Sequence, residues 1–363
     1  MKNFLPFVIL IILCFSCKKD NPKETYKSDC SKGEFSMWVD DRIELLSVVQ
    51  HFTTWAAIRH TKYDVAYKHE VDSFFSAYSN HRAVSLCQQF IDNHFAYDAP
   101  AAFVLYHNHL PGFEQNTPYT DYLINRAGSK SKLEDFAEAL KDFAEESDFL
   151  TFYNAHKEYY DSLIAYIEGY IPDDIDYIDV VENYYGSCKL SYNLIAAPLF
   201  HAGGYGPEIE TDSGKHIFSI QGPSSSKEGI PVFGDKAWFE YVTLHEFSHS
   251  FVNPTTSTFN KEIYNSSELF TPIEKIMKQQ NYSNWETCVN EHLVRTNVAR
   301  MNYLLNGEKS KNKVLQNEYN QGFIYIYQLD TLMQRYENNR DLFPTYDSFY
   351  QEIVSCFNTM KSK

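Results

Sequence analysis

The sequence lacks both an excess of positive charge and any internal repeat. Its 363 residues carry 32 lysines and arginines against 48 aspartates and glutamates, which gives a formal net charge of −16. Proteins that bind nucleic acid present a basic surface to the phosphates, so we expect no nucleic-acid partner. At this length the chain buries a substantial core, as one large domain or as two smaller ones.

Cysteines are few and scattered. Of the seven, two stand near the N-terminus, and the other five are separated by long intervals: Cys30, Cys87, Cys188, Cys288 and Cys356. Their number is odd, and no two have the spacing of a metal-binding pair. A disulfide framework is therefore not indicated, while a single isolated bridge remains open.

The N-terminal segment MKNFLPFVILIILCFSC has the pattern of a secretory signal. Its apolar run, residues 4–15, is too short to span a bilayer, and polar residues follow soon after. Ser16-Cys17 resembles the cleavage site of bacterial lipoproteins, which predicts a signal peptide at 1–16 and a lipid on Cys17. Ordinary secretion with cleavage nearby is the alternative. Residues 17–34 are polar and are predicted to be a tether that leaves the protein lipid-anchored in the cell envelope, on a periplasmic or surface face.

Apolar periodicity divides the rest of the chain into two regions. Residues 35–185 place apolar side chains at three- and four-residue steps and are predicted to be helical, with Asp40 or Asp41 as the first cap. Residues 186–363 mix strand and helix patterns. We expect strands at 190–200 and 216–221, a loop at 221–234, a helix from Asp235 that Pro254 ends, and further helices at 271–280 and from 284 onward.

The stretch VTLHEFSHSF contains His245, Glu246 and His249. Histidines four residues apart lie on one helix face, from which both imidazoles can reach one zinc ion. Glu246 is rotated by about 100° from His245, where its carboxylate takes a proton from the metal-bound water. The pattern predicts one Zn²⁺ per chain with Glu246 as the general base.

Chance produces this spacing in roughly three of a hundred chains of this composition. The neighbours Leu244, Phe247, Ser248 and Ser250 are all uncharged, as a buried zinc helix requires. The alternative is a helix with two core histidines and no metal.

The motif and its flanks resemble the zincin metallopeptidases. The segments WVDDRIELLSVVQHF, GGYGPEI, HEFSHSFVNP and WETCVNEHLVR also resemble an uncharacterised-domain family of bacterial lipoproteins placed among gluzincin-like peptidases. The resemblance implies an α+β, predominantly helical fold in which residues 186–363 form a catalytic region with a small mixed sheet. It also implies a peptide or protein substrate and a third zinc ligand, a glutamate from a later helix.

Three glutamates are candidates for that third ligand: Glu268, Glu286 and Glu291. Glu268 lies in NSSELF, which resembles a turn. Glu286 and Glu291 are separated by about 140° around their helix, so only one of them can face the metal. Glu291 is favoured because it begins an apolar face that continues through Val294, Val298, Met301 and Leu305; the other two remain alternatives.

Other residues are assigned by position. Arg295, one turn after Glu291, either holds its carboxylate or forms a surface pair with it. His292 is expected to be exposed. The segment 195–209 resembles the edge strand that binds substrate in zincins, and Tyr205, Tyr325 and Tyr327 are open candidates for the oxyanion donor.

These observations favour a lipid-anchored zinc metallopeptidase. One alternative is a non-enzymatic surface lipoprotein whose aromatic residues, 16% of the chain, bind a glycan or a protein. Another is a zinc-retaining protein without activity. The sequence indicates no particular oligomeric state.

Overall fold

A small mixed sheet lies among helices in the computed structural model, which describes residues 30–55, 57 and 64–361. The strands β1 (Glu34–Trp38), β2 (Ser191–Ala196) and β5 (Gly214–Gly222) run parallel to one another. Two short strands, β3 (Gly203–Tyr205) and β4 (Glu208–Thr211), pair antiparallel with β5. The predominantly helical α+β class is confirmed, and β2 and β5 fall where strands were predicted. The predicted signal peptide and Cys17 lie outside the described residues.

The first described element corrects the expectation of helix from residue 35 onward. Residues 34–38 form β1, and Glu34 pairs with Ser191 in β2. A partner this far along the chain leaves no mark on local periodicity, so the pattern could not show the strand. Asp40 then caps α1 (Asp41–His51) by accepting hydrogen bonds from the backbone N–H groups of Arg42 and Ile43.

Helix α1 is buried along almost its whole length, because the helices that follow wrap around it. This agrees with the helical pattern of residues 35–185. The surrounding helices are α3 (Ala66–Phe75), α4 (Arg82–Asp92), α5 (Asp98–Leu105), α6 (Asp121–Ala127), α7 (Lys130–Glu146), α8 (Phe149–Ala155), α9 (Lys157–Glu168) and α10 (Tyr177–Tyr185).

The segment predicted as a loop at 221–234 contains a hairpin. Strands β6 (Ser225–Lys227) and β7 (Ile230–Val232) pair antiparallel. Glu228 in the turn has φ of 52°, a left-handed value that glutamate rarely takes. A hairpin turn is usually recognised in a sequence by a pair such as Asn-Gly. Glu228 stands in the place of the asparagine, so the hairpin was not predicted.

Helix α11 (Lys236–Thr258) starts where predicted but does not stop at Pro254. Proline has no N–H, so the carbonyl of Ser250 loses its partner within the helix. Lys189 donates to that carbonyl from Nζ at 2.6 Å. This outside donor satisfies the orphaned oxygen, and the helix continues for another turn.

The remaining chain is helical. Helix α14 begins where the sequence predicted, with Asn284 as the cap that accepts from the Thr287 N–H at 2.9 Å. The helices are α12 (Asn260–Tyr264), α13 (Glu274–Gln279), α14 (Trp285–Asn306), α15 (Glu308–Asn320), α16 (Ile326–Asn338) and α17 (Tyr346–Lys361).

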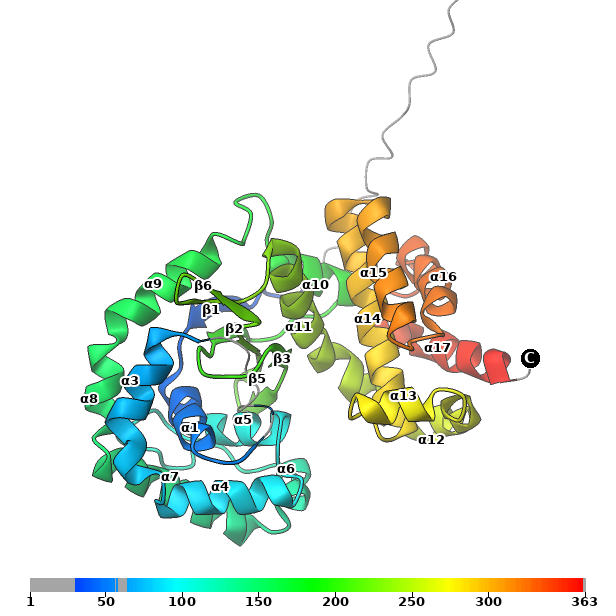
Figure 1. The fold of residues 1–363 in the computed structure, drawn as a ribbon. Coiled ribbons are helices and arrows are strands. Elements are labelled where there is room, and N and C mark those ends of the chain that lie inside the picture. Colours follow the sequence, from blue (N-terminus) through cyan, green and yellow to red (C-terminus); the bar gives the residue numbers. More distant parts are fainter. Residues whose placement is uncertain (1–29, 56, 58–63, 362–363) are drawn as a thin grey trace, which may run out of the picture.

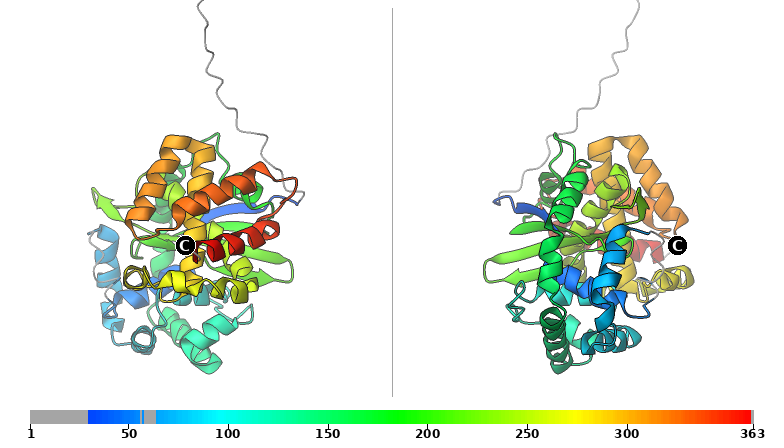
Figure 2. Two further views of the ribbon diagram at one scale, coloured as in Figure 1. Left: turned by 90° about the vertical axis from the view of Figure 1, so that its right-hand side faces the viewer. Right: turned by 60° about the vertical axis from the view of Figure 1, so that its left-hand side comes forward.

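Two lobes result, joined by α11 (Figure 1). We call residues 34–232 the N-terminal lobe and residues 260–361 the C-terminal lobe. The C-terminal helices stack in front of the sheet when the molecule is viewed from their side (Figure 2). Among the described residues, no helix combines the length and apolarity needed to cross a bilayer.

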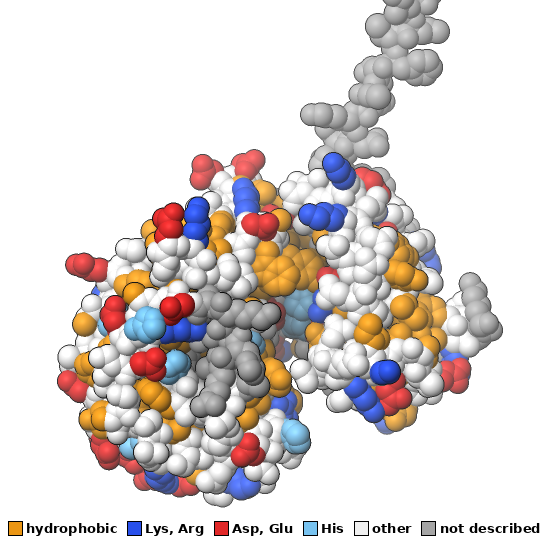
Figure 3. All heavy atoms as spheres, in the orientation of Figure 1, with side chains coloured by type: hydrophobic (Ala, Val, Ile, Leu, Met, Phe, Trp, Pro, Cys, Tyr) orange, Lys and Arg blue, Asp and Glu red, His pale blue; other side chains and the backbone are white. Residues whose placement is uncertain are grey.

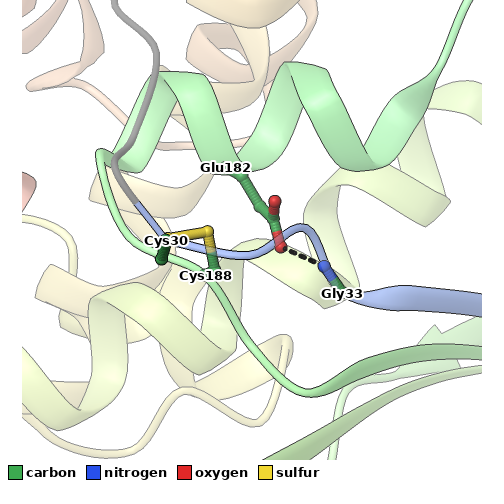
Figure 4. Close-up of a disulfide and its surroundings, with 4 residues drawn as sticks. All are labelled: Cys30, Gly33, Glu182 and Cys188. Atoms are coloured by element: carbon green, nitrogen blue, oxygen red, sulfur yellow. Dashed lines mark hydrogen bonds between the residues drawn. A yellow bond between two sulfur atoms is a disulfide. The ribbon is translucent and has the colours of Figure 1, made fainter.

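One disulfide joins Cys30 to Cys188, with their Cα atoms 6.0 Å apart (Figure 4). Beside it, Glu182 accepts a hydrogen bond from the Gly33 N–H at 3.0 Å. Residues 30–34, expected at the end of the tether, are therefore attached to the fold. The single bridge that the cysteine pattern left open is present, and it connects segments 158 residues apart.

Candidate metal centre

Helix α11 carries the histidine motif through the interior, between β5 and α14. Asp235 caps it by accepting from the Trp238 N–H at 2.8 Å. Leu244 and Phe247 lie in the core, and Glu246 and His245 are almost fully buried. The uncharged neighbours noted in the sequence are therefore packing residues of a buried helix.

His245, His249 and Glu291 converge on one point. The Nε2 atoms of the two imidazoles are 3.1 Å apart. The Glu291 carboxylate reaches both, with Oε2 at 3.6 Å from Nε2 of His245 and Oε1 at 3.5 Å from Nε2 of His249. Two imidazole nitrogens from α11 and both carboxylate oxygens from α14 thus surround one point, and we call these three side chains the metal triangle.

The triangle fits a zinc ion. Ligands at 2.0–2.1 Å from zinc and at tetrahedral angles lie about 3.3–3.4 Å from one another. The distance between the two imidazole nitrogens, and the distance from each nitrogen to its nearer Glu291 oxygen, bracket that value. Two imidazoles and one carboxylate are also a ligand set that zinc accepts while keeping a fourth position open. The residues present therefore fit the metal in both type and spacing.

The other two candidate ligands lie elsewhere. Glu286 accepts a hydrogen bond from the Asn260 side chain at 3.0 Å. Glu268 is exposed and lies 3.7 Å from Nζ of Lys361. Within the described part of the chain, neither belongs to the group of ligand atoms around the two histidines. Glu291 is the carboxylate that the fold brings to them.

Arg295 holds Glu291 in place. Its Nε donates to Oε2 of Glu291 at 3.2 Å, and its Nη1 donates to Oε2 of Glu318 at 2.6 Å. The guanidinium also lies over the ring of Phe323, 4.2 Å from the centroid. Arg295 is therefore buried between two carboxylates, and the surface-pair alternative is wrong.

Glu246 lies beside the triangle and faces strand β3. The backbone passes so close that a Cβ on Gly204 would lie 2.8 Å from Oε1 of Glu246, and one on Gly206 would lie 2.3 Å from its carbonyl oxygen. Glycine is needed at both positions for this approach. Burial, followed by the charge of Glu291, raises the pKa of Glu246 to about 8. A nearby divalent cation would favour the carboxylate form.

His292 was expected to be exposed, and this is wrong. Its ring is fully buried against Phe323 and Tyr325, and Nδ1 lies 2.7 Å from the carbonyl of Cys288. Burial lowers its pKa to about 4. Glu291 and His292 are neighbours on α14, but both faces of this helix are covered, so a helical periodicity could not identify the exposed side.

The three tyrosines suggested as oxyanion donors are occupied. Tyr205 lines the cleft described below, but its hydroxyl donates to Nε2 of His201, because Nδ1 of that ring bonds the Ala202 carbonyl. Tyr325 donates to the Leu269 carbonyl, and Tyr327 donates to Gln316. None of these three protons is free for a substrate.

Two other tyrosines lie at the site and were missed. The ring of Tyr241 is 5.7 Å from that of His245, and its hydroxyl donates to Glu318 at 2.6 Å. Tyr282 accepts from Nη2 of Arg295 at 3.1 Å. Tyr241 precedes His245 by four residues, so the helix face that carries the two histidines was a signal that could have located it. Tyr282 lies in a loop and had no such signal.

A cleft of about 1550 Å³ opens onto the triangle between the two lobes. Figure 3 shows the hollow, with hydrophobic side chains at its rim and a histidine within it. Its walls come from both lobes and from strand β3. They include Trp55, Tyr97, Asp98, Tyr122, Tyr205, Trp238, Tyr282 and Asn290. The cleft is large enough for a segment of polypeptide.

Comparison with known proteins gives one match. Residues 35–356 match the model of a family described as a domain of unknown function, DUF4932. No curated protein and no solved structure matches the chain. The match covers both lobes and the cleft between them.

Proposed function

The chain belongs to the DUF4932 family, and we propose that it is a zinc-dependent hydrolase that cleaves peptide bonds. The convergence of His245, His249 and Glu291 beside the buried carboxylate of Glu246 carries this proposal. Two imidazoles and a carboxylate would hold one Zn²⁺ per chain. A carboxylate next to such a set, but outside it, is what a general base requires.

When bound, zinc supplies a Lewis acid that polarises a substrate carbonyl and lowers the pKa of water. Side chains of the protein transfer the proton and orient the ligands. Glu246 accepts the proton of the attacking water on its carboxylate and then delivers it to the leaving amine. Arg295 keeps the Glu291 carboxylate directed at the two histidines.

Strand β3 supports a peptide as the substrate. It pairs with β5 on one side and ends the sheet on the other, and it lines the cleft beside Glu246. An extended peptide adds to such an edge through backbone hydrogen bonds, whatever its side chains. The close approach of Gly204 and Gly206 to Glu246 would bring the bound backbone next to the base.

Tyr282 is the oxyanion donor in this proposal. Its hydroxyl oxygen accepts from Arg295, so its own proton remains available to the cleft. Its side chain also lies within electrostatic reach of Glu291 and Glu246. A donor held before the reaction stabilises the negative oxygen without reorganisation.

The disulfide supports a place outside the cytoplasm. Such bridges form and persist in oxidising compartments and are rare in the cytosol. Cys30–Cys188 therefore agrees with export and with a lipid anchor on Cys17. We propose a cell-envelope lipoprotein whose catalytic cleft lies between the two lobes.

The test measures zinc and turnover separately. Purified, dialysed protein should contain about one zinc per chain by plasma mass spectrometry and should cleave fluorescently labelled casein. Glu246→Gln should keep the zinc and lose at least about a hundredfold in rate, while Glu291→Gln should lose the zinc. Glu286→Gln is the matched control and should keep both. A metal-free wild type, or full activity in Glu246→Gln, would refute the proposal.

A further inference from the structure

Trp238 is a large aromatic side chain left exposed at the mouth of the cleft. It is 44% exposed and stands in the first turn of α11, where Lys236 and Ala237 are exposed as well, before the helix enters the interior. It lines the same cleft as His245 and Glu246. Part of this apolar ring therefore faces water at the cleft, while the rest packs against the protein.

The indole is fixed by its surroundings. A Cβ on Gly234, whose φ is +81°, would lie 2.1 Å from Cδ1 of Trp238, so the backbone of that glycine closes against the ring. Tyr241 stacks beside it, with ring centroids 5.9 Å apart and an interplanar angle of 19°. The ring is therefore held in place before any ligand arrives.

Trp238 also stands in line with the metal triangle. Trp238, Tyr241, His245 and His249 follow one another at steps of three, four and four residues along one face of α11. Successive ring centroids are 5.9, 5.7 and 4.8 Å apart. This row of rings leads from the exposed rim to the buried site.

The spacing corresponds to a length of substrate. Seven residues of α-helix, from Trp238 to His245, cover about 10.5 Å. An extended peptide advances about 3.3 Å per residue. A chain that lies along this face therefore brings to Trp238 the side chain about three residues from the bond being cleaved.

We propose that Trp238 is a specificity residue that stacks on an aromatic side chain of the peptide, about three residues from the scissile bond. The inference rests on the proposed peptidase function. A fixed indole with an exposed face favours a planar partner, because stacked aromatic pairs gain attraction beyond the burial of their area. The substrate class is thus a peptide with an aromatic residue at a set distance from the cleavage point.

The experiment uses acetylated, amidated decapeptides of alanine, serine and lysine with one phenylalanine moved through the positions. With the wild type, phenylalanine about three residues from the cleaved bond should raise kcat/KM by about tenfold over alanine. Trp238→Ala should abolish this gain, and Trp238→Phe should retain most of it. Tyr264→Ala is the matched control, since Tyr264 is 67% exposed and is not among the cleft-lining residues.

Binding separates this inference from the hydrolase proposal. Glu246→Gln, titrated by calorimetry with zinc present, should bind the phenylalanine peptide about tenfold more tightly than the alanine peptide. Glu246→Gln combined with Trp238→Ala should bind the two equally. Selective binding without cleavage by the wild type would refute the hydrolase and keep the aromatic subsite. A preference for the phenylalanine peptide that persists in Trp238→Ala would overturn the proposed aromatic subsite. So would a gain in affinity that appears only when a serine of the peptide carries a sugar.

Discussion

Arg295 donates a hydrogen bond from Nε to Oε2 of Glu291, the residue one turn before it on α14, at 3.2 Å. The same guanidinium pairs with Glu318 on α15. Glu318 balances the charge of Arg295, so the Glu291 carboxylate is oriented without being fully neutralised. The proposed zinc site thus depends on a residue that does not touch the metal.

Replacing Arg295 should therefore weaken zinc binding. Loss of an outer partner that orients a metal ligand typically lowers affinity by about 10–100-fold, and we expect this range for Arg295→Met in a competition with a fluorescent chelator. Lys278→Met is the control, because Lys278 lines the cleft but pairs with Glu274. Unchanged affinity in Arg295→Met would show that Glu291 needs no support.

Helix geometry indicated the three proposed ligands, but it left open whether Arg295 holds Glu291 or forms a surface pair with it. The 3.6-residue period places His245 and His249 together, and the apolar face after Glu291 selects it over Glu286. Both arguments work because α11 and α14 are long helices. The fold brings together the residues that these faces predicted.

Features that depend on distant partners were not accessible. Strand β1 forms only because it pairs with β2. Helix α11 continues beyond Pro254 because Lys189 donates to the carbonyl that the proline leaves without a partner. Both β2 and Lys189 are far away in the sequence from the segments that they stabilise. Tyr282 reaches the site from a loop. His292 was misassigned because an exposed face exists only when one side of a helix meets water. Periodicity describes a helix and its face, while the neighbours that cover the helix come from tertiary structure.

A second prediction concerns Gly206. A Cβ there would overlap the backbone oxygen of Glu246 at 2.3 Å, so strand β3 would have to move away from α11. Gly206→Ala should lower the free energy of unfolding by about 1–3 kcal/mol, in the range of overpacked interiors, measured by urea denaturation. It should also reduce activity more than zinc content, because the displaced strand carries the substrate edge. Gly169→Ala, whose Cβ would meet its nearest neighbour at 3.2 Å, should change stability by less.

A third prediction concerns the buried carboxyl of Glu44 on α1. Tyr67 donates to Oε2 at 2.7 Å, and burial raises the pKa of Glu44 to about 8, with a smaller contribution from Asp40. Between the ordinary glutamate pKa and about 8 the folded state binds a proton that the unfolded state releases. Stability from this group is therefore complete at low pH and is lost as the pH rises to 8.

Glu44→Gln should remove this dependence. From pH 5 to pH 8, the wild type should lose about 2–4 kcal/mol of unfolding free energy relative to the variant, in urea titrations at each pH. Glu138→Gln, a change to a side chain that is 68% exposed, should follow the wild type. Parallel pH profiles for the wild type and Glu44→Gln would contradict the assignment.

The fourth prediction tests Tyr282 as the oxyanion donor. Removing its hydroxyl leaves the ring beside Phe323 and deletes one donor, while Arg295 keeps its bonds to Glu291 and Glu318. Tyr282→Phe should therefore lower kcat by about 10²–10³ with unchanged zinc content and little change in KM. Tyr327→Phe is the control, since that hydroxyl bonds Gln316 away from the site. A fall in zinc content that matched the fall in kcat would show that Tyr282 only supports Arg295, because a donor to the developing oxyanion acts after the metal is bound.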